Sequence, residues 1–298
     1  MKYIDVNETV KMSQVVAGCM RAADAGMEGD ALLEFAEACI DMGVTTFDHA
    51  PVYGGYTCEK LFGDAVLRKN PALRKKMQIV TKTGIVLPGK NGNKTIYYES
   101  SKEEIKKEIE ASLLNLGTDH VDLLLVHRPD PLANPEETAD ALDTLVKEGK
   151  TLSIGVSNFM PGQITMLQSY MKNPIATNQM ELSVKTTENF FNGVTDDAFT
   201  RRMPLMAWSP LGGGSVFGGA DEQSARLRKT IREIADAHGT SMDVIMYAWL
   251  FIHPVRIAAI TGTMNIDRVE YAVEALDVSL TYDEWYLILE ASRGYCVP

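Results

Sequence analysis

Short apolar runs alternate with longer amphipathic segments along almost the whole chain. The apolar runs occupy residues 14–17, 44–47, 77–81, 121–126, 152–156, 175–179, 205–208 and 257–260. Most consecutive positions in these runs are apolar, whereas a strand with one solvated face would alternate apolar and polar residues. The pattern therefore predicts eight strands that are buried on both faces, as in a parallel sheet covered by helices.

The segments between these runs have the spacing of amphipathic helices. In 103–116 apolar residues recur at helical intervals, with a predicted capping box of Ser101 and Glu104 at the start and Gly117 after the end. The segment 226–238 repeats this pattern and stops before Gly239. The apolar segment 244–252 is too short to cross a bilayer, so it predicts a buried helix and no membrane contact.

The alternation of strands and helices continues without a linker or low-complexity stretch, which indicates one domain of the α/β class over residues 1–298. We predict a (β/α)8 barrel, also called a TIM barrel, with a short segment before the first strand and extra helices near the C-terminus. A doubly wound open sheet is the alternative, but its first strand is usually followed by a G-x-G-x-x-G turn. Here the first strand is followed by Gly18, Cys19, Met20 and Arg21, which favours the barrel.

Polar residues stand where many of the predicted strands end. They are Asp48, Lys82, His127, Ser157, Asn158, Gln179 and Ser209. In a barrel all these ends meet at one mouth. The connection 84–100 is longer than usual and contains Asn91-Gly92, so we expect it to lie over that mouth.

Three of these mouth residues, together with Tyr53, suggest proton chemistry. Tyr53 lies five residues after Asp48 in a loop that contains proline and glycine. A phenol has an unperturbed pKa near ~10, and an ammonium at Lys82 is expected to lower it towards the range of efficient proton donation. Asp48 is expected to keep Lys82 charged, and His127 can hydrogen-bond a substrate oxygen. Each residue alone also has a purely structural interpretation, so the combination carries the prediction.

The composition narrows the classes of partner. The net charge of −11 argues against nucleic acid, because phosphate binding requires a basic face. The four cysteines have no C-x-x-C spacing and no signal peptide is evident, so a reducing cytoplasm is expected. Neither H-E-x-x-H nor clustered Cys and His residues occur, so no metal is expected. The oligomeric state stays open.

Three motifs resemble those of the aldo-keto reductases, and the resemblance extends over essentially the whole chain. They are "GVTTFDHAPVYG" at 43–54, "VTKTG" at 80–84 and "LLLVHRPDP" at 123–131, the last being most similar to a bacterial branch of oxidoreductases in this family. The resemblance implies that Tyr53 is the general acid, that Lys82 and Asp48 tune it, and that His127 orients the substrate carbonyl.

The same resemblance implies an extended nicotinamide dinucleotide. Its implied contacts are Gly18, Met20, Ser157, Asn158, Gln179, Trp208, Ser209, Leu211, Gly212, Thr263, Asn265 and Arg268. Arg268 stands where the family commonly places an arginine near the adenosine 2′-phosphate, which favours NADPH over NADH. Two departures from the family pattern are Gly262, in place of a frequent cation, and Ala272, in place of an amide that reads adenine.

The predicted activity is NADPH-dependent reduction of an aldehyde or ketone to an alcohol, with hydride from the nicotinamide C4 and a proton from Tyr53. The partner is therefore a small carbonyl compound whose identity the sequence leaves open. Three alternatives remain at this point. They are a cofactor-binding sensor or regulatory subunit with slow turnover, an aldolase that forms a Schiff base at Lys82, and a scaffold without a ligand.

Overall fold

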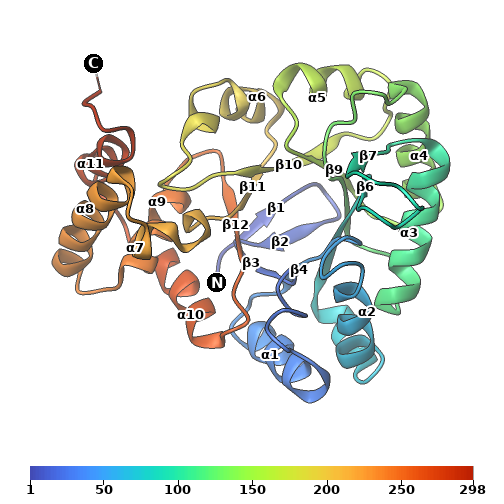
Figure 1. The fold of residues 1–298 in the computed structure, drawn as a ribbon, viewed down its shortest axis with the longest axis horizontal. Coiled ribbons are helices and arrows are strands. Elements are labelled where there is room, and N and C mark those ends of the chain that lie inside the picture. Colours follow the sequence, from blue (N-terminus) through green and yellow to red (C-terminus); the bar gives the residue numbers. More distant parts are fainter. Residues whose placement is uncertain (298) are drawn as a thin grey trace.

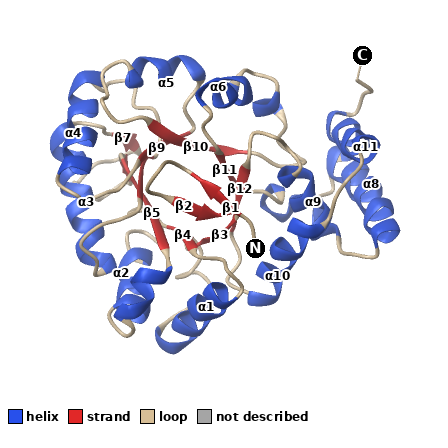
Figure 2. Ribbon diagram, turned by 180° about the vertical axis from the view of Figure 1, so that it is seen from behind, coloured by secondary structure: helices blue, strands red, loops and turns tan. Residues whose placement is uncertain are grey.

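The computed structural model describes residues 1–297 and contains a closed barrel of parallel strands (Figure 2). Its strands are β3 (Val15–Gly18), β4 (Thr46–Asp48), β5 (Gln78–Thr83), β8 (Leu123–Val126), β9 (Ile154–Ser157), β10 (Ile175–Glu181), β11 (Leu205–Trp208) and β12 (Ile257–Thr261). Strand β12 pairs with β3 and closes the barrel. The predicted (β/α)8 barrel is therefore confirmed. The last residue of the predicted domain, Pro298, lies outside the described residues.

Every predicted run overlaps one barrel strand, but several boundaries differ. Strand β4 begins later than predicted and includes Asp48, while β5 and β9 extend to include Lys82 and Ser157. These three polar residues thus belong to the last pleats of their strands, whereas His127, Asn158 and Ser209 follow the ends of β8, β9 and β11. The backbones of the first three are held in the ladder by neighbouring strands, so their side chains occupy fixed positions at the mouth.

Helices surround the barrel on its outside (Figure 1). They are α1 (Gly29–Asp41), α2 (Cys58–Phe62), α3 (Lys102–Leu116), α4 (Pro135–Lys147), α5 (Pro161–Gln168), α6 (Val194–Arg201), α7 (Ser215–Gly218), α8 (Glu222–His238), α9 (Met242–Phe251), α10 (Ile266–Glu274) and α11 (Tyr282–Arg293). Among residues 1–297, none of these helices has the length and apolar character needed to span a membrane.

The predicted cap of α3 is only half present. The Ser101 hydroxyl accepts a hydrogen bond from the Glu104 amide at 3.3 Å. The Glu104 side chain does not return to the Ser101 backbone, because it pairs with Lys107 at 2.8 Å. A complete capping box instead starts α11, where Thr281 and Glu284 bond each other's amides.

The predicted N-terminal segment is an antiparallel hairpin of β1 (Tyr3–Asp5) and β2 (Lys11–Ser13). Its buried side chains form one apolar cluster with side chains from the barrel interior. The members of this cluster are Ile4, Val6, Val10, Met12, Val16, Val80, Leu123, Leu125, Ala176, Met206, Ala258 and Ile260. The Ser13 amide also bonds the Thr46 hydroxyl at the amino end of β4. The hairpin therefore closes the end of the barrel opposite the mouth.

The long connection 84–100 forms a second hairpin, with β6 (Ile85–Val86) paired to β7 (Tyr97–Tyr98). It leaves the barrel directly after Lys82 and Thr83. The buried carboxylate of Glu108 fixes this exit, since one oxygen accepts hydrogen bonds from the Thr83 hydroxyl and the Gly84 amide, both at 2.6 Å. Farther along, the Leu87 amide donates to the Tyr56 hydroxyl at 2.8 Å. The hairpin is thus tied to the carboxyl end of β5.

Glu108 gives this anchor a pH dependence. Burial raises the pKa of Glu108 from 4.5 to about 7, so between these pH values the folded state keeps a proton that the unfolded state has lost. Stability from this group therefore falls as pH rises through that window and stays low above it. We expect Glu108→Gln to keep the acceptor oxygen while removing this dependence. Its unfolding free energy relative to the wild type should rise by roughly 3 kcal/mol across the window.

Urea unfolding of both proteins at several pH values measures this difference. Glu103→Gln serves as the control, because Glu103 is exposed at the start of the same helix. If the difference in unfolding free energy between Glu108→Gln and the wild type did not change with pH, the proposed link between this carboxyl group and the anchor would be wrong.

The extra C-terminal helices are confirmed. Helices α8 and α11 pack against each other at the edge of the molecule, and the described C-terminus lies beside them (Figures 1 and 2). Two tryptophans join α11 to α9: the rings of Trp249 and Trp285 stack at 4.9 Å. Each indole N–H donates to the other residue's carbonyl oxygen, at 3.0 and 3.1 Å. This pair connects the outer helices to the barrel layer.

Candidate active site

A buried ion pair lies at the mouth of the barrel. The Lys82 ammonium is 2.8 and 2.7 Å from the two carboxylate oxygens of Asp48, and both side chains are almost fully buried. Neighbouring strands β4 and β5 bring the pair together, as predicted. Burial lowers the pKa of Lys82, and the attraction of the Asp48 carboxylate acts against that shift.

Tyr53 completes a cluster with this pair. Its hydroxyl oxygen lies 2.8 Å from the Lys82 nitrogen and 3.3 Å from the nearer Asp48 oxygen. The loop that carries it turns sharply at Gly54, where φ is +58° and a Cβ atom would lie 2.7 Å from the Cys58 sulfur. Only glycine fits such a turn without strain. The three side chains predicted to act together are thus in direct contact.

The predicted direction of the pKa shift of Tyr53 is wrong. The sequence argument had the Lys82 ammonium lowering the pKa of the phenol. Burial, and next the negative charge of Asp48, instead raise the pKa of Tyr53 well above 10. The carboxylate offsets the ammonium because the two lie side by side. The phenol therefore keeps its proton at neutral pH, which a proton donor requires.

His127 follows the end of β8 and faces the same cluster. Its ring meets the Tyr53 ring edge to face, with the ring centroids 6.1 Å apart. Burial, and next the positive charge of Lys82, lower the pKa of His127 to about 2, so the imidazole is neutral. Neither ring nitrogen bonds another side chain or backbone group in residues 1–297. A neutral ring at the mouth can therefore donate one N–H to a ligand.

Sequence reasoning missed His49, which directly follows Asp48. Its carbonyl oxygen accepts a hydrogen bond from the Lys82 ammonium at 2.9 Å. Its ring points out of the barrel and contacts Phe62 of α2, with ring centroids 4.6 Å apart. Burial lowers the pKa of His49 to about 3. Successive side chains of a strand point to opposite faces of the sheet, so the sequence could have predicted that the His49 ring points away from the side on which Asp48 lies.

Four predicted cofactor residues form a chain of hydrogen bonds around the mouth. The Trp208 indole donates to the Asn158 side chain at 3.0 Å, and the Asn158 amide donates to the Ser157 hydroxyl at 2.8 Å. That hydroxyl donates to the Gln179 carbonyl at 2.9 Å. Gln179 then donates from its side chain to Asp48, also at 2.9 Å. The chain links these strand ends to the ion pair, a contact the sequence did not reveal.

The loop after β11 contains the next three predicted residues. Ser209 is half-buried and has a φ of +51°, which is uncommon for a residue with a side chain. Leu211 packs against the apolar core. Gly212 begins a short 3-10 turn over Gly212–Gly214 and has a φ of +57°. All three residues lie in the loop after the strand that carries Trp208, and their contact with a cofactor stays a prediction.

The start of α10 contains the last group of predicted residues. The Asn265 side chain caps this helix and accepts from the amides of Asp267 and Arg268 at 2.9 and 3.3 Å. The Thr263 hydroxyl accepts from the Asn265 amide at 3.1 Å. Arg268 is exposed in the first turn and has no ion-pair partner among residues 1–297. Its guanidinium is therefore available to an anion.

Arg21 is a second cation at this place, and sequence reasoning did not assign it a role. One of its guanidinium nitrogens lies 3.4 Å from the Gly262 carbonyl oxygen. Gly262 is the position where the expected cation is missing, so Arg21 restores positive charge there from a different loop. Ala272, the other departure, is fully buried in the core.

Gly18 and Met20 lie at the end of β3. A Cβ atom on Gly18 would approach the Thr261 carbonyl oxygen to 2.6 Å, so close packing against β12 requires glycine here. Met20 has an exposed side chain, and its carbonyl accepts from the Cys58 thiol at 3.6 Å. Gly18 is the last residue of β3 and therefore lies at the carboxyl end of the barrel, and Met20 follows two residues later.

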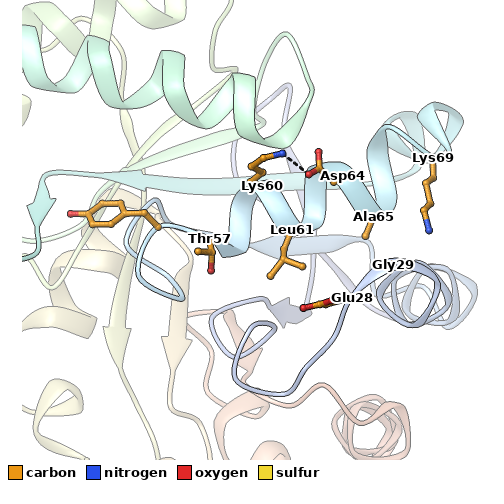
Figure 3. A pocket seen from close by; sticks show the side chains of 9 residues that line it. Glu28, Gly29, Thr57, Lys60, Leu61, Asp64, Ala65 and Lys69 are labelled. Carbon is orange, nitrogen blue, oxygen red and sulfur yellow. Dashed lines mark hydrogen bonds and ion pairs between the residues drawn. The ribbon is translucent and has the colours of Figure 1, made fainter.

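A separate hollow of about 420 Å³ lies between α2 and the start of α1 (Figure 3). It is lined by Glu28, Gly29, Tyr56, Thr57, Lys60, Leu61, Asp64, Ala65 and Lys69. Its charged groups are largely paired, with Lys60 bonded to Asp64 at 2.5 Å and Lys69 to Asp30 at 2.7 Å. None of the predicted site residues lines this hollow, so it is distinct from the mouth.

The residues at the mouth fit a nicotinamide dinucleotide. Asn158, Ser157 and Gln179 offer amide and hydroxyl groups beside the ring of Trp208, which suits a carboxamide on an aromatic ring. Two guanidinium groups without an ion-pair partner among residues 1–297, those of Arg21 and Arg268, lie near the amino end of α10 in a chain of net charge −11. Positive charge at that place suits a phosphate.

Comparisons with known proteins agree with this geometry. The chain is 43% identical over 301 aligned positions to the uncharacterized oxidoreductase YcsN of Bacillus subtilis, with 100% of both chains covered. It is 41% identical over 297 positions to the 6-dehydroglucose reductase of Agrobacterium fabrum, with 99% of both covered. The crystal structure of the thermostable aldo-keto reductase Tm1743 with the inhibitor epalrestat superposes with a TM-score of 0.81 at 25% identity. The match covers 98% of this chain and 100% of that one.

The family match covers nearly the whole barrel. A model of the Aldo/keto reductase family matches residues 14–293, which include the ion pair, Tyr53, His127 and the start of α10. With the closed barrel and the cluster at its mouth, this match establishes that the chain belongs to the aldo-keto reductase family.

Proposed function

We propose that the protein reduces an aldehyde or ketone to an alcohol with NADPH, and that Tyr53 supplies the proton. The observation that carries this proposal is the hydroxyl of Tyr53, held 2.8 Å from a buried ammonium at the mouth. Bound there, the dinucleotide would supply a hydride. Ser157, Asn158, Gln179 and Trp208 would hold its nicotinamide end.

The chain's own residues account for the proton. The Lys82 ammonium donates to the Tyr53 oxygen. The Tyr53 hydroxyl donates its own hydrogen to Asp48 across 3.3 Å, and this hydrogen can turn to a substrate oxygen in the mouth. The neutral His127 ring donates a second hydrogen bond to that oxygen and orients the carbonyl. When the proton leaves, Lys82 stabilises the phenolate that forms. Asp48, which accepts a hydrogen bond from Gln179, holds the ammonium in place for this role.

The contacts of Lys82 disfavour the aldolase alternative. A Schiff base needs a neutral amine with a free lone pair. Here four oxygen atoms surround the nitrogen within 2.9 Å, namely both Asp48 carboxylate oxygens, the His49 carbonyl and the Tyr53 hydroxyl. This arrangement favours the charged form and leaves little access for a carbonyl carbon.

The oxidation of NADPH in the presence of carbonyl compounds tests the proposal. The panel should contain aliphatic and aromatic aldehydes, ketones, quinones and a sugar-derived aldehyde, since the Agrobacterium fabrum relative is named a 6-dehydroglucose reductase. We expect multiple turnovers with some members. Binding of NADPH followed by a single slow turnover would support the sensor instead, and an adduct on Lys82 after borohydride treatment would support the aldolase. If the protein neither binds nor oxidises NADPH, the result would support the scaffold.

Arg268 tests the choice of NADPH over NADH. A guanidinium bonded to a phosphate contributes about 1.5–3 kcal/mol, so Arg268→Met should weaken NADPH binding roughly tenfold or more. NADH lacks the 2′-phosphate, so its affinity should change much less. Titration of the dinucleotide fluorescence measures both constants, with Arg232→Met on the exposed face of α8 as the control. If Arg268→Met weakened the binding of NADPH and NADH equally, the contact with the 2′-phosphate would belong to another residue, and Arg21 would be the next residue to substitute.

A further inference from the structure

Arg128 lies directly beside the proposed proton-transfer site. It follows His127 at the end of β8 and is half-buried. Its guanidinium carbon lies 5.9 Å from the ring centroid of Trp208, at the geometry of a cation–π contact. The side chain is therefore held at the mouth between the residue proposed to orient the carbonyl and the indole at the end of β11.

This guanidinium has no anionic partner among the described residues. Arg128 makes no ion pair and no side-chain hydrogen bond with any of residues 1–297. The nearest carboxylate along the chain, Asp130, is engaged elsewhere, because its oxygens accept from the Ser100 and Leu132 amides at 2.9 and 2.8 Å. The N–H donors of Arg128 are therefore open to an anion that the described residues do not supply.

The charge of Arg128 also reaches the site. Together with burial and Lys82, it lowers the pKa of His127. An anion bound at Arg128 would therefore sit close to the cluster without contacting the Lys82 ammonium, whose donors are taken by Asp48, His49 and Tyr53. A ligand that touches both places has a carbonyl group at one end and a negative group at the other.

We infer that Arg128 selects carbonyl substrates that carry a carboxylate, by forming a hydrogen-bonded ion pair with that group. The inference rests on the proposed function and names the substrate class for it. One planar guanidinium matches the two oxygens and single charge of one carboxylate. A phosphate is the other oxyanion that Arg128 could bind, and in that case the cofactor would be the source.

Paired substrates test this inference. We would measure kcat/KM for 3-formylbenzoate and 4-formylbenzoate, each against its methyl ester, in the wild type and in Arg128→Met. The wild type should prefer the acid, and the variant should reduce the ratio of acid to ester by roughly tenfold or more, mainly through KM. Arg128→Lys should keep part of the preference, because it keeps the charge. Arg232→Met is the matched control and should keep the wild-type ratio.

Two further measurements separate the possible failures. Calorimetric binding of benzoate against benzamide reports on the anion site without turnover. Benzoate binding that needs Arg128 would support the site even if no carbonyl compound were reduced, in which case only the proposed function would fall. Equal acid and ester efficiencies in the wild type, or benzoate binding that Arg128→Met leaves intact, would overturn the inference. So would a loss of NADPH affinity in Arg128→Met as large as the loss of acid preference, since it would assign Arg128 to the cofactor.

Discussion

Tyr53→Phe should reduce kcat by roughly two to four orders of magnitude, the range that a positioned general acid contributes. The substitution removes only the hydroxyl group and keeps the ring that meets His127 edge to face. Proton transfer from this oxygen is needed only in the transition state, so kcat and kcat/KM should fall together. The affinity for NADPH should stay close to that of the wild type.

Steady-state kinetics and dinucleotide titration together check this result. Tyr56→Phe is a matched control, because Tyr56 lies on the same loop and its hydroxyl bonds the Leu87 amide instead of the ion pair. Near-normal turnover in Tyr53→Phe would assign proton donation to another group and remove the main support of the proposed reaction. Loss of dinucleotide binding would show that the substitution disturbs the mouth as a whole.

Lys82→Met should unfold more easily than the wild type by roughly 3–5 kcal/mol, the usual cost of breaking a buried ion pair from one side. The variant would leave the Asp48 carboxylate buried with Gln179 as its remaining strong donor. Turnover should be lost as well, because no ammonium would stabilise the phenolate of Tyr53. Both effects follow from the complete burial of the Lys82 side chain.

A double-mutant cycle separates the two effects. Asp48→Asn with Lys82→Met removes both charges, so the double variant should regain much of the stability that Lys82→Met loses. It should not regain turnover. Denaturant unfolding measures the first quantity and NADPH oxidation the second. A double variant that is no more stable than Lys82→Met would mean that the lost stability comes from packing around the lysine stem.

The sequence predicted the barrel because its strands are apolar at consecutive positions, a pattern that depends on burial and not on distant contacts. It predicted the contact of Asp48, Lys82 and Tyr53 because strand ends in a barrel meet at one mouth. The strand limits were less accurate: the polar ends of β4, β5 and β9 belong to the ladder. Their membership depends on pairing with neighbours, which no local pattern reveals.

Other features depend on contacts between distant segments. The hairpin that closes the barrel has only short strands, so nothing local distinguished it from an extended tail. The pKa of Tyr53 was predicted in the wrong direction, because the balance of burial, Asp48 and Lys82 depends on their distances. The bond between Gln179 and Asp48 joins residues 131 positions apart. Arg128 stood in the quoted motif, but its lack of a partner became visible only in three dimensions.

The closed amino end of the barrel has a consequence for the order in which ligands bind and dissociate. Side chains of the hairpin and of the barrel strands fill the interior below the mouth, so a ligand reaches the ion pair from the carboxyl ends of the strands. When two ligands bind from the same side, the ligand that binds deeper must bind first and dissociate last. A dinucleotide bound against the strand ends would thus bind before each carbonyl compound and dissociate after each alcohol.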